Sequence, residues 1–125
     1  MKQLLWIIGT LLVCSCFAFA AEDISGKWEG KFVITADGET HDDTACLILK
    51  QSGTELTGTG GPNSGEQWPI TNGKVEGDKL TFDVQSPGPL IKFSLTVVGG
   101  HLKGQAKAEA DGHVMTGEMD LQRSK

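Results

Sequence analysis

Several residue types are scarce or absent in this chain. Its 125 residues include no tyrosine, four prolines and three cysteines. After the first twenty residues, no stretch of ten or more repeats apolar residues at a helical period, which argues against an α-helix there. Cys14 and Cys16 lie in the N-terminal segment, so Cys46 remains alone and an internal disulfide is excluded. Stability must therefore come from packing and from backbone hydrogen bonds, with Cys46 expected as a small buried strand residue.

Enzyme motifs are missing as well. The sequence contains no G-x-S-x-G, no H-E-x-x-H and no phosphate-binding loop. Acidic residues that alternate with apolar ones are expected on a solvated outer wall, namely Asp83, Glu109, Glu118 and Asp120. We therefore predict that the protein is not an enzyme, has no catalytic residues and uses no cofactor.

The polar residues expected at one end of the fold are candidates for a divalent metal site. Imidazoles and carboxylates are legitimate metal ligands, and this end holds His41, Asp42, Asp43, Asp111 and His113. No characteristic ligand spacing connects these residues. Polar loops also contain such residues without binding a metal. We predict solvated loops and no metal site.

The charge balance is acidic. The chain has 16 Asp and Glu residues against 11 Lys and Arg residues, a net charge of −5. This balance argues against nucleic acid and against anionic membrane surfaces as partners.

The only long apolar run lies at the N-terminus. Lys2 precedes a nearly continuous apolar segment over residues 4–17, and Ala18-Phe19-Ala20 has the A-x-A form of a cleavage site. This predicts a signal peptide over residues 1–20 and one domain over 21–125, of 125 − 20 = 105 residues. We expect an exported protein, periplasmic or extracellular, without an integral membrane segment in the mature chain. An alternative stays open, because Val13-Cys14-Ser15-Cys16 resembles an imperfect lipobox that would carry a lipid anchor on Cys16.

The rest of the chain alternates apolar and polar residues with period two. In residues 24–34 the apolar side chains of Trp28, Phe32 and Ile34 share one face, and charged residues occupy the other. Seven further strands are predicted, at residues 44–51, 55–60, 68–75, 80–85, 91–97, 102–110 and 113–122. The facing of 44–51 stays ambiguous because both of its sides are apolar. Asn72-Gly73 predicts a bulge in the fourth strand.

A weak internal repeat supports hairpins that follow one another. Similar turn-plus-leucine segments are centred on Leu56, Leu80 and Leu102, with spacings of 80 − 56 = 24 and 102 − 80 = 22 residues. An open meander would leave two exposed edges, and closing the last strand onto the first removes both. About eight strands make the smallest comfortable barrel. The predicted fold class is therefore all-β, an antiparallel up-and-down closed barrel of about eight strands.

Loop lengths predict a difference between the two barrel ends. Residues 36–43, 61–66 and 86–89 are expected as longer loops at one end, which would form an open mouth. The turns at the other end are short, and Trp28 begins the first strand there. Trp28 is therefore expected to close that end.

The residues Gly26-Lys27-Trp28 and Arg123 resemble the calycin group, which includes lipocalins, avidin-like barrels and small bacterial secreted lipocalin-like proteins. In lipocalins the tryptophan of G-x-W closes the barrel and a last-strand arginine lies across its ring. The resemblance implies these structural roles for Gly26, Trp28 and Arg123, with a cation–π contact between the last two. Leu56-Thr57-Gly58-Thr59 also resembles a segment of avidin-like barrels. The lipocalin disulfide is missing and no biotin-binding set is recognisable, so no biotin residues are assigned.

An apolar cup is predicted at the mouth. Small-molecule sites are concave and mostly apolar, and the candidate ligand-binding residues are Trp68, Phe32, Ile34, Phe82, Phe93 and Met115. A fully packed core is the alternative for the same residues. We expect a non-catalytic exported barrel that binds a small, largely apolar ligand at its open end. The alternatives are a protein-binding module or protease inhibitor that uses the open-end loops, and a lipid-anchored structural envelope protein.

Overall fold

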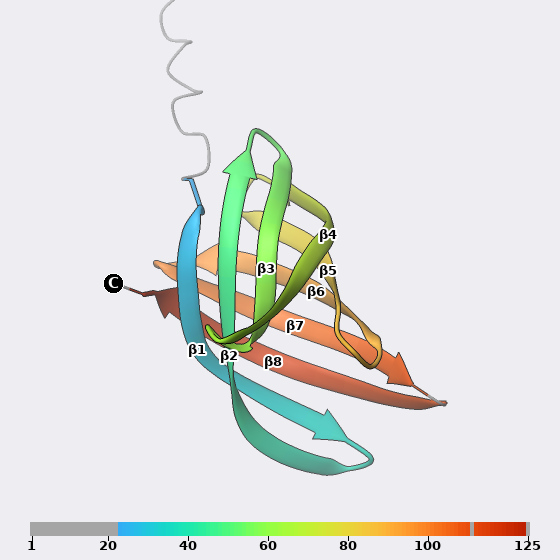
Figure 1. Cartoon of the computed structure of the whole chain (residues 1–125). Helices are drawn as coiled ribbons and strands as arrows, with labels where there is room; N and C mark the ends of the chain where they lie inside the picture. The colour runs from blue at the N-terminus through green and yellow to red at the C-terminus, as the bar shows by residue number, and fades with distance from the viewer. Residues whose placement is uncertain (1–22, 111, 125) are drawn as a thin grey trace, which may run out of the picture.

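The computed structural model describes residues 23–110 and 112–124. Consecutive strands pair antiparallel, and β8 returns to pair with β1, which closes the barrel (Figure 1). This confirms the predicted all-β, eight-stranded up-and-down barrel. The predicted signal peptide and Cys16 lie outside the described residues. The strands are β1 (Gly26–Ala36), β2 (Glu39–Ser52), β3 (Glu55–Asn63), β4 (Glu66–Glu76), β5 (Lys79–Gln85), β6 (Leu90–Val98), β7 (His101–Ala110) and β8 (His113–Arg123).

Alternation decides which side chains enter the barrel. On β2, Ala45, Leu47 and Leu49 are buried, whereas Ile48 between them is 40% exposed. The ambiguous facing of this strand is thereby settled, because its odd-numbered residues pair with the even-numbered residues of β1 that point inward. On β7, Gly104, Ala106 and Ala108 face inward and pair with the larger Leu95, Phe93 and Ile91 of β6.

The interior is packed along most of its length. Leu80, Phe82, Leu95, Leu102 and Leu121 are each at most 1% exposed. Fully burying each such side chain contributes about 1.5–3 kcal/mol relative to leaving it in water, so this layer dominates the stability of the barrel. The fully packed core predicted as the alternative thus describes the centre of the barrel.

One end of the barrel is closed by residues from both ends of the described chain. Trp28 is 1% exposed, and its indole Nε1–H donates to the Ile24 carbonyl at 3.0 Å. The Arg123 guanidinium lies 4.6 Å from the centroid of the indole ring and donates at 2.6 Å to the carbonyls of both Asp23 and Ser25. The expected contact between Trp28 and Arg123 is therefore present, and Ile24, itself buried, completes the plug.

Gly26 leaves the space that this arrangement needs. Its φ of +134° is disfavoured for other residues, and a Cβ there would lie 3.0 Å from the Arg123 guanidinium. The glycine of the Gly26-Lys27-Trp28 segment thus lets the arginine side chain reach across the indole.

The predicted long loops are wrong in two places. Residues 36–43 form the end of β1, a two-residue turn and the start of β2, and β3 and β4 are likewise joined by the two residues 64–65. Asp37 and Gly38 both have positive φ, as a tight hairpin turn requires. The flanking residues are polar on both faces because this hairpin projects into solvent, which gives a strand the composition of a loop. Of the three predicted loops only residues 86–89 remain one.

The open end is therefore shaped by strand length. β1, β2, β7 and β8 continue past their neighbours, so that β1 pairs with β2 as far as Ala36↔Glu39, while β3 leaves β2 after Cys46↔Gly61. We call residues 33–44, 109–110 and 112–116 the overhang. Figure 1 shows its two hairpins, β1–β2 and β7–β8, reaching beyond the other strands. Within the described residues no helix is long and apolar enough to cross a bilayer.

Candidate ligand site at the open end

An apolar cavity of about 100 Å³ lies at the open end, at the base of the overhang. It exists because β3 turns away from β2 while β2 continues, which leaves the inner face of the barrel uncovered between them. Its lining is mostly hydrophobic and comes from β1 to β6, with residues Phe32, Asp43, Thr44, Ala45, Leu47, Gly60, Gly61, Pro62, Trp68, Val84, Ile91 and Phe93.

Aromatic rings form the floor of the cavity. Phe82 stacks on Phe93 with ring centroids 4.8 Å apart and planes inclined by 12°, and Phe32 lies 6.5 Å from Phe93. Phe32 fits closely against β8, because a Cβ at Gly117 would overlap its ring. The floor is therefore held from below by packed rings, whereas Phe32 and Trp68 remain half-buried at the opening.

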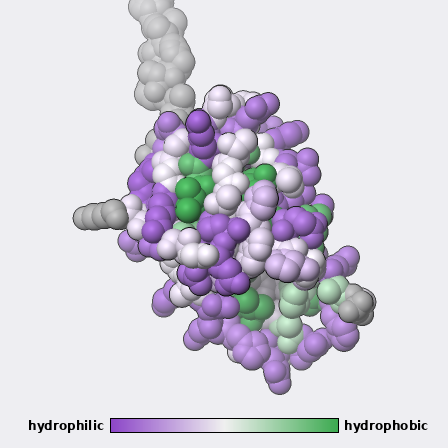
Figure 2. Space-filling model, in the orientation of Figure 1, coloured by the Kyte–Doolittle hydropathy of each residue, from purple (hydrophilic) through white to green (hydrophobic). Residues whose placement is uncertain are grey.

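Three of the six predicted ligand-binding residues line this cavity, namely Trp68, Phe32 and Phe93. Phe82 lies beneath them in the core, 1% exposed. Ile34 and Met115 lie farther out on the overhang, half-buried on its inner face. Figure 2 shows hydrophobic surface in the hollow beside the two projecting hairpins.

The contribution of β2 to the cavity wall was not predicted from the sequence. Asp43 was assigned to a loop and Thr44 to the start of the second strand, whereas strand pairing with β1 holds both at the rim. Ala45 was left out because the facing of its strand was unknown. Residues 39–43 are polar at both inward and outward positions, so no apolar alternation signalled a strand there.

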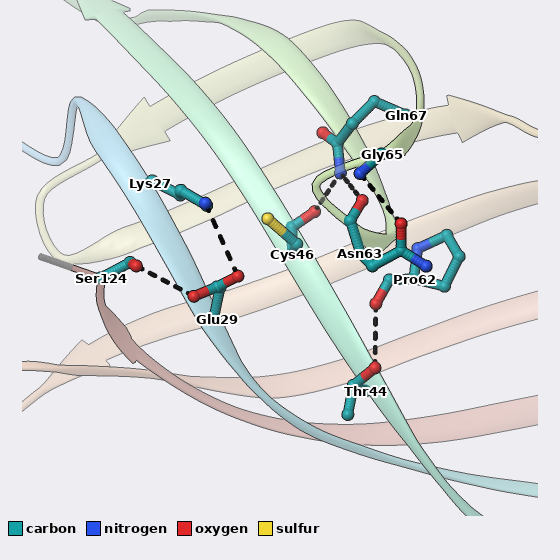
Figure 3. Close-up of polar contacts among 9 residues, drawn as sticks. All are labelled: Lys27, Glu29, Thr44, Cys46, Pro62, Asn63, Gly65, Gln67 and Ser124. Carbon is teal, nitrogen blue, oxygen red and sulfur yellow. Dashed lines mark hydrogen bonds and ion pairs between the residues drawn. The ribbon is translucent and has the colours of Figure 1, made fainter.

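Side-chain hydrogen bonds attach the β3–β4 turn to β2 (Figure 3). Thr44 Oγ1 donates to the Pro62 carbonyl at 2.9 Å, and Gln67 Nε2 donates to the carbonyls of Cys46 at 3.0 Å and Asn63 at 2.8 Å. The Asn63 side chain in turn accepts from the Gly65 N–H at 2.9 Å. These bonds replace the ladder hydrogen bonds that a longer β3 would have made, and they fix the cavity wall that carries Trp68.

Cys46 lies on the outer side of β2 and is 1% exposed. Burial raises the pKa of its thiol, and the neighbouring Glu29 carboxylate raises that pKa further. Figure 3 shows the sulfur directed toward β1, where Glu29 is held by Lys27 and Ser124. A buried thiol kept protonated in this way is a packing group rather than a nucleophile.

The polar residues weighed as a metal site belong to the overhang. His113 Nδ1 lies 3.1 Å from Asp37 Oδ1, which links the two projecting hairpins, and His41 lies 3.9 Å from Glu39. Asp111 is outside the described residues. Among the residues that the structure does describe, no three His, Cys, Asp or Glu side chains are arranged to hold a metal ion.

Comparison with protein-family models, with curated proteins and with solved structures finds no match to this chain. The eight-stranded antiparallel closed barrel is the architecture that calycin-type barrels share, and it stands here on the strand pairing alone.

Proposed function

We propose that this protein is a non-catalytic exported barrel that binds a small, largely apolar group at its open end. The observation that supports the proposal is the cavity of about 100 Å³ between Phe32, Trp68 and Phe93, with hydrophobic walls and a hydroxyl and carboxylate at the rim. Such a combination of apolar lining and few polar groups is typical of small-molecule sites. The proposed relationship to calycin-type lipocalin-like barrels agrees with this placement of the site opposite the Trp28 plug.

The cavity volume limits the size of the bound group. Drug-sized ligands use pockets of about 300–1,000 Å³, whereas a dry apolar cavity of about 150 Å³ accommodates benzene. At about 100 Å³ the cavity takes at most one ring or a short branched chain, and any remainder must lie on the inner face of the overhang. For a ligand of this size we expect a dissociation constant on the order of 0.1–1 mM.

The experiment is a calorimetric titration with toluene. The Ala45→Leu variant places an isobutyl group in the cavity and should abolish saturable binding, while Thr57→Leu, at an exposed position of β3, should leave it unchanged. Circular dichroism establishes that both variants are folded. The proposal is overturned if toluene shows no saturable binding to the unmodified protein, or if Ala45→Leu binds it equally well.

A protein-binding module is the second candidate, and one observation favours it. The open end lacks the two long loops near residues 36–43 and 61–66 that were expected to make the contact, and presents the overhang with a strand edge in their place. A partner would then contact β2 rather than loops.

The third expectation, a lipid-anchored envelope protein, depends on Cys16, which is outside the described residues. Mass spectrometry of the mature N-terminus tests this expectation.

A further inference from the structure

We propose that the uncovered edge of β2, residues 39–44, binds an extended cationic polypeptide segment by strand addition. The proposal rests on the proposed function in one respect, because an apolar side chain of the segment would use the same cavity. Its own basis is the backbone edge and the charge of β2.

The edge exists because β3 stops early. β3 pairs with β2 only from Cys46 to Ser52. Among the described residues the strand ladder joins residues 39–45 to β1 alone, and Thr44 contacts β3 through its side-chain bond to the Pro62 carbonyl. An unpaired strand edge presents free N–H and C=O groups, which is a template for an added strand. A segment that docked here would lie beside residues 39–44 of β2, on the side where β3 lies beside residues 46–52.

Backbone alternation identifies the groups that face this edge. The Cys46 carbonyl accepts from Gln67 on the β3 side, so the backbone groups of Thr44, Asp42 and Thr40 point the same way. The Thr44 N–H is already occupied by its neighbour's carboxylate, Asp43 Oδ1, at 2.8 Å. The Asp42 N–H and carbonyl are therefore the central pair offered to an added strand.

The charge of the hairpin selects a basic partner. Residues 37–43 contain Asp37, Glu39, Asp42 and Asp43 and no lysine or arginine. Lys31 is paired with Thr44 across the β1–β2 ladder and also faces Asp120 on β8. Opposite charges on adjacent strands stabilise pairing, and like charges oppose it.

The same charges disfavour a second copy of this chain as the occupant. Two β2 edges paired antiparallel about Asp42 would place the two Asp42 carboxylates directly opposite each other, which is destabilising. A cationic segment instead places its lysines or arginines beside Asp42 on the outer face, since Asp42 points outward and Asp43 inward toward the cavity. An apolar side chain beside Asp43 would then reach the space lined by Trp68.

The test uses an acetylated peptide in which lysine alternates with leucine, and a matched peptide with glutamate in place of lysine. Binding is followed by calorimetry, and amide hydrogen exchange is followed by NMR. We expect the lysine peptide to bind saturably and to slow exchange at Asp42, while exchange at Asp43, whose N–H faces β1, stays unchanged. The glutamate peptide should not bind.

Two variants and one modified peptide separate the contributions. Asp42→Asn should weaken binding by about 2–5-fold, the range expected for one exposed ion pair, whereas Asp78→Asn at the opposite end should have no effect. Asp42→Pro removes the edge N–H and should weaken binding more than about tenfold. If that variant does not fold, N-methylation of the peptide leucines removes the same hydrogen bonds without changing the protein.

Each alternative result decides the matter. Equal binding of the two peptides, absence of lysine-peptide binding, or binding without protection of Asp42 overturns the proposal. A dimer in solution that protects Asp42 would assign the edge to a second copy and also overturn it. Toluene binding measured in parallel distinguishes the two proposals, because Asp42→Pro should keep toluene binding, and failure of toluene alone refutes only the cavity function.

Discussion

Replacing Arg123 tests the closed end of the barrel most sharply. Its guanidinium lies 4.6 Å from the Trp28 ring centroid and donates two hydrogen bonds of 2.6 Å, to the carbonyls of Asp23 and Ser25. An exposed cation–π contact contributes about 0.5–1 kcal/mol. Each of the two hydrogen bonds, discounted for the exposure of the side chain, contributes about 0.5–1 kcal/mol. Their sum gives about 2 kcal/mol for the loss on Arg123→Met, whose apolar stem still covers the indole.

Urea unfolding followed by fluorescence measures this loss. For a domain of roughly this size, about 2 kcal/mol also corresponds to a fall in Tm of about 8–16 °C. Arg123→Lys keeps the charge but not the fork of donors, so we expect roughly half the loss. Lys50→Met, at an exposed position of β2, serves as the control and should change stability by less than about 0.5 kcal/mol. If Arg123→Met is as stable as that control, the plug does not hold the barrel closed as described.

Three further predictions concern the wall and floor of the barrel. Gly117→Ala should push the Phe32 ring into the cavity, cost about 1–3 kcal/mol in urea unfolding and weaken toluene binding, and unchanged stability would contradict the packing described. The hydrogen bond from His101 lowers the pKa of Asp120, so its contribution to stability is present above the ordinary aspartate pKa and is lost as pH falls through the lowered value. Asp120→Asn should therefore be less stable than the unmodified protein at neutral pH and equal to it in acid, and a constant difference would refute this. Burial raises the pKa of the Cys46 thiol, so its reaction with a disulfide reagent should be far slower in the native state than in urea, and equal rates would contradict its burial.

The sequence predicted the parts of the fold that depend on alternation. Period-two patterning located all eight strands, and the Asn72-Gly73 bulge appears as a register shift between Thr71 and Lys74. At Gly73 a side chain would collide with the Leu56 carbonyl, which explains the glycine. The contact between Trp28 and Arg123 came from resemblance and not from periodicity, because alternation cannot report which residues meet across a barrel end.

The open end was predicted less well, for a physical reason. A strand that projects past its neighbours is solvated on both faces, so residues 39–43 carry no apolar alternation although they are strand. Cavity size is also beyond a pattern of apolar positions, because it depends on where β3 leaves β2. Phe82 and Phe93 are examples. Alternation places both side chains inward, but only Phe93 lines the cavity, and Phe82 stacks on it in the core.

The most direct test of a ligand site at the open end compares the indole NMR resonances of Trp68 and Trp28 during a toluene titration. Trp68 lines the cavity, whereas the Trp28 N–H is buried at the other end and bonded to Ile24. We predict a saturable shift of the Trp68 indole resonance and a stationary Trp28 resonance. Movement of Trp28 with a stationary Trp68, or no movement of either, would contradict the site.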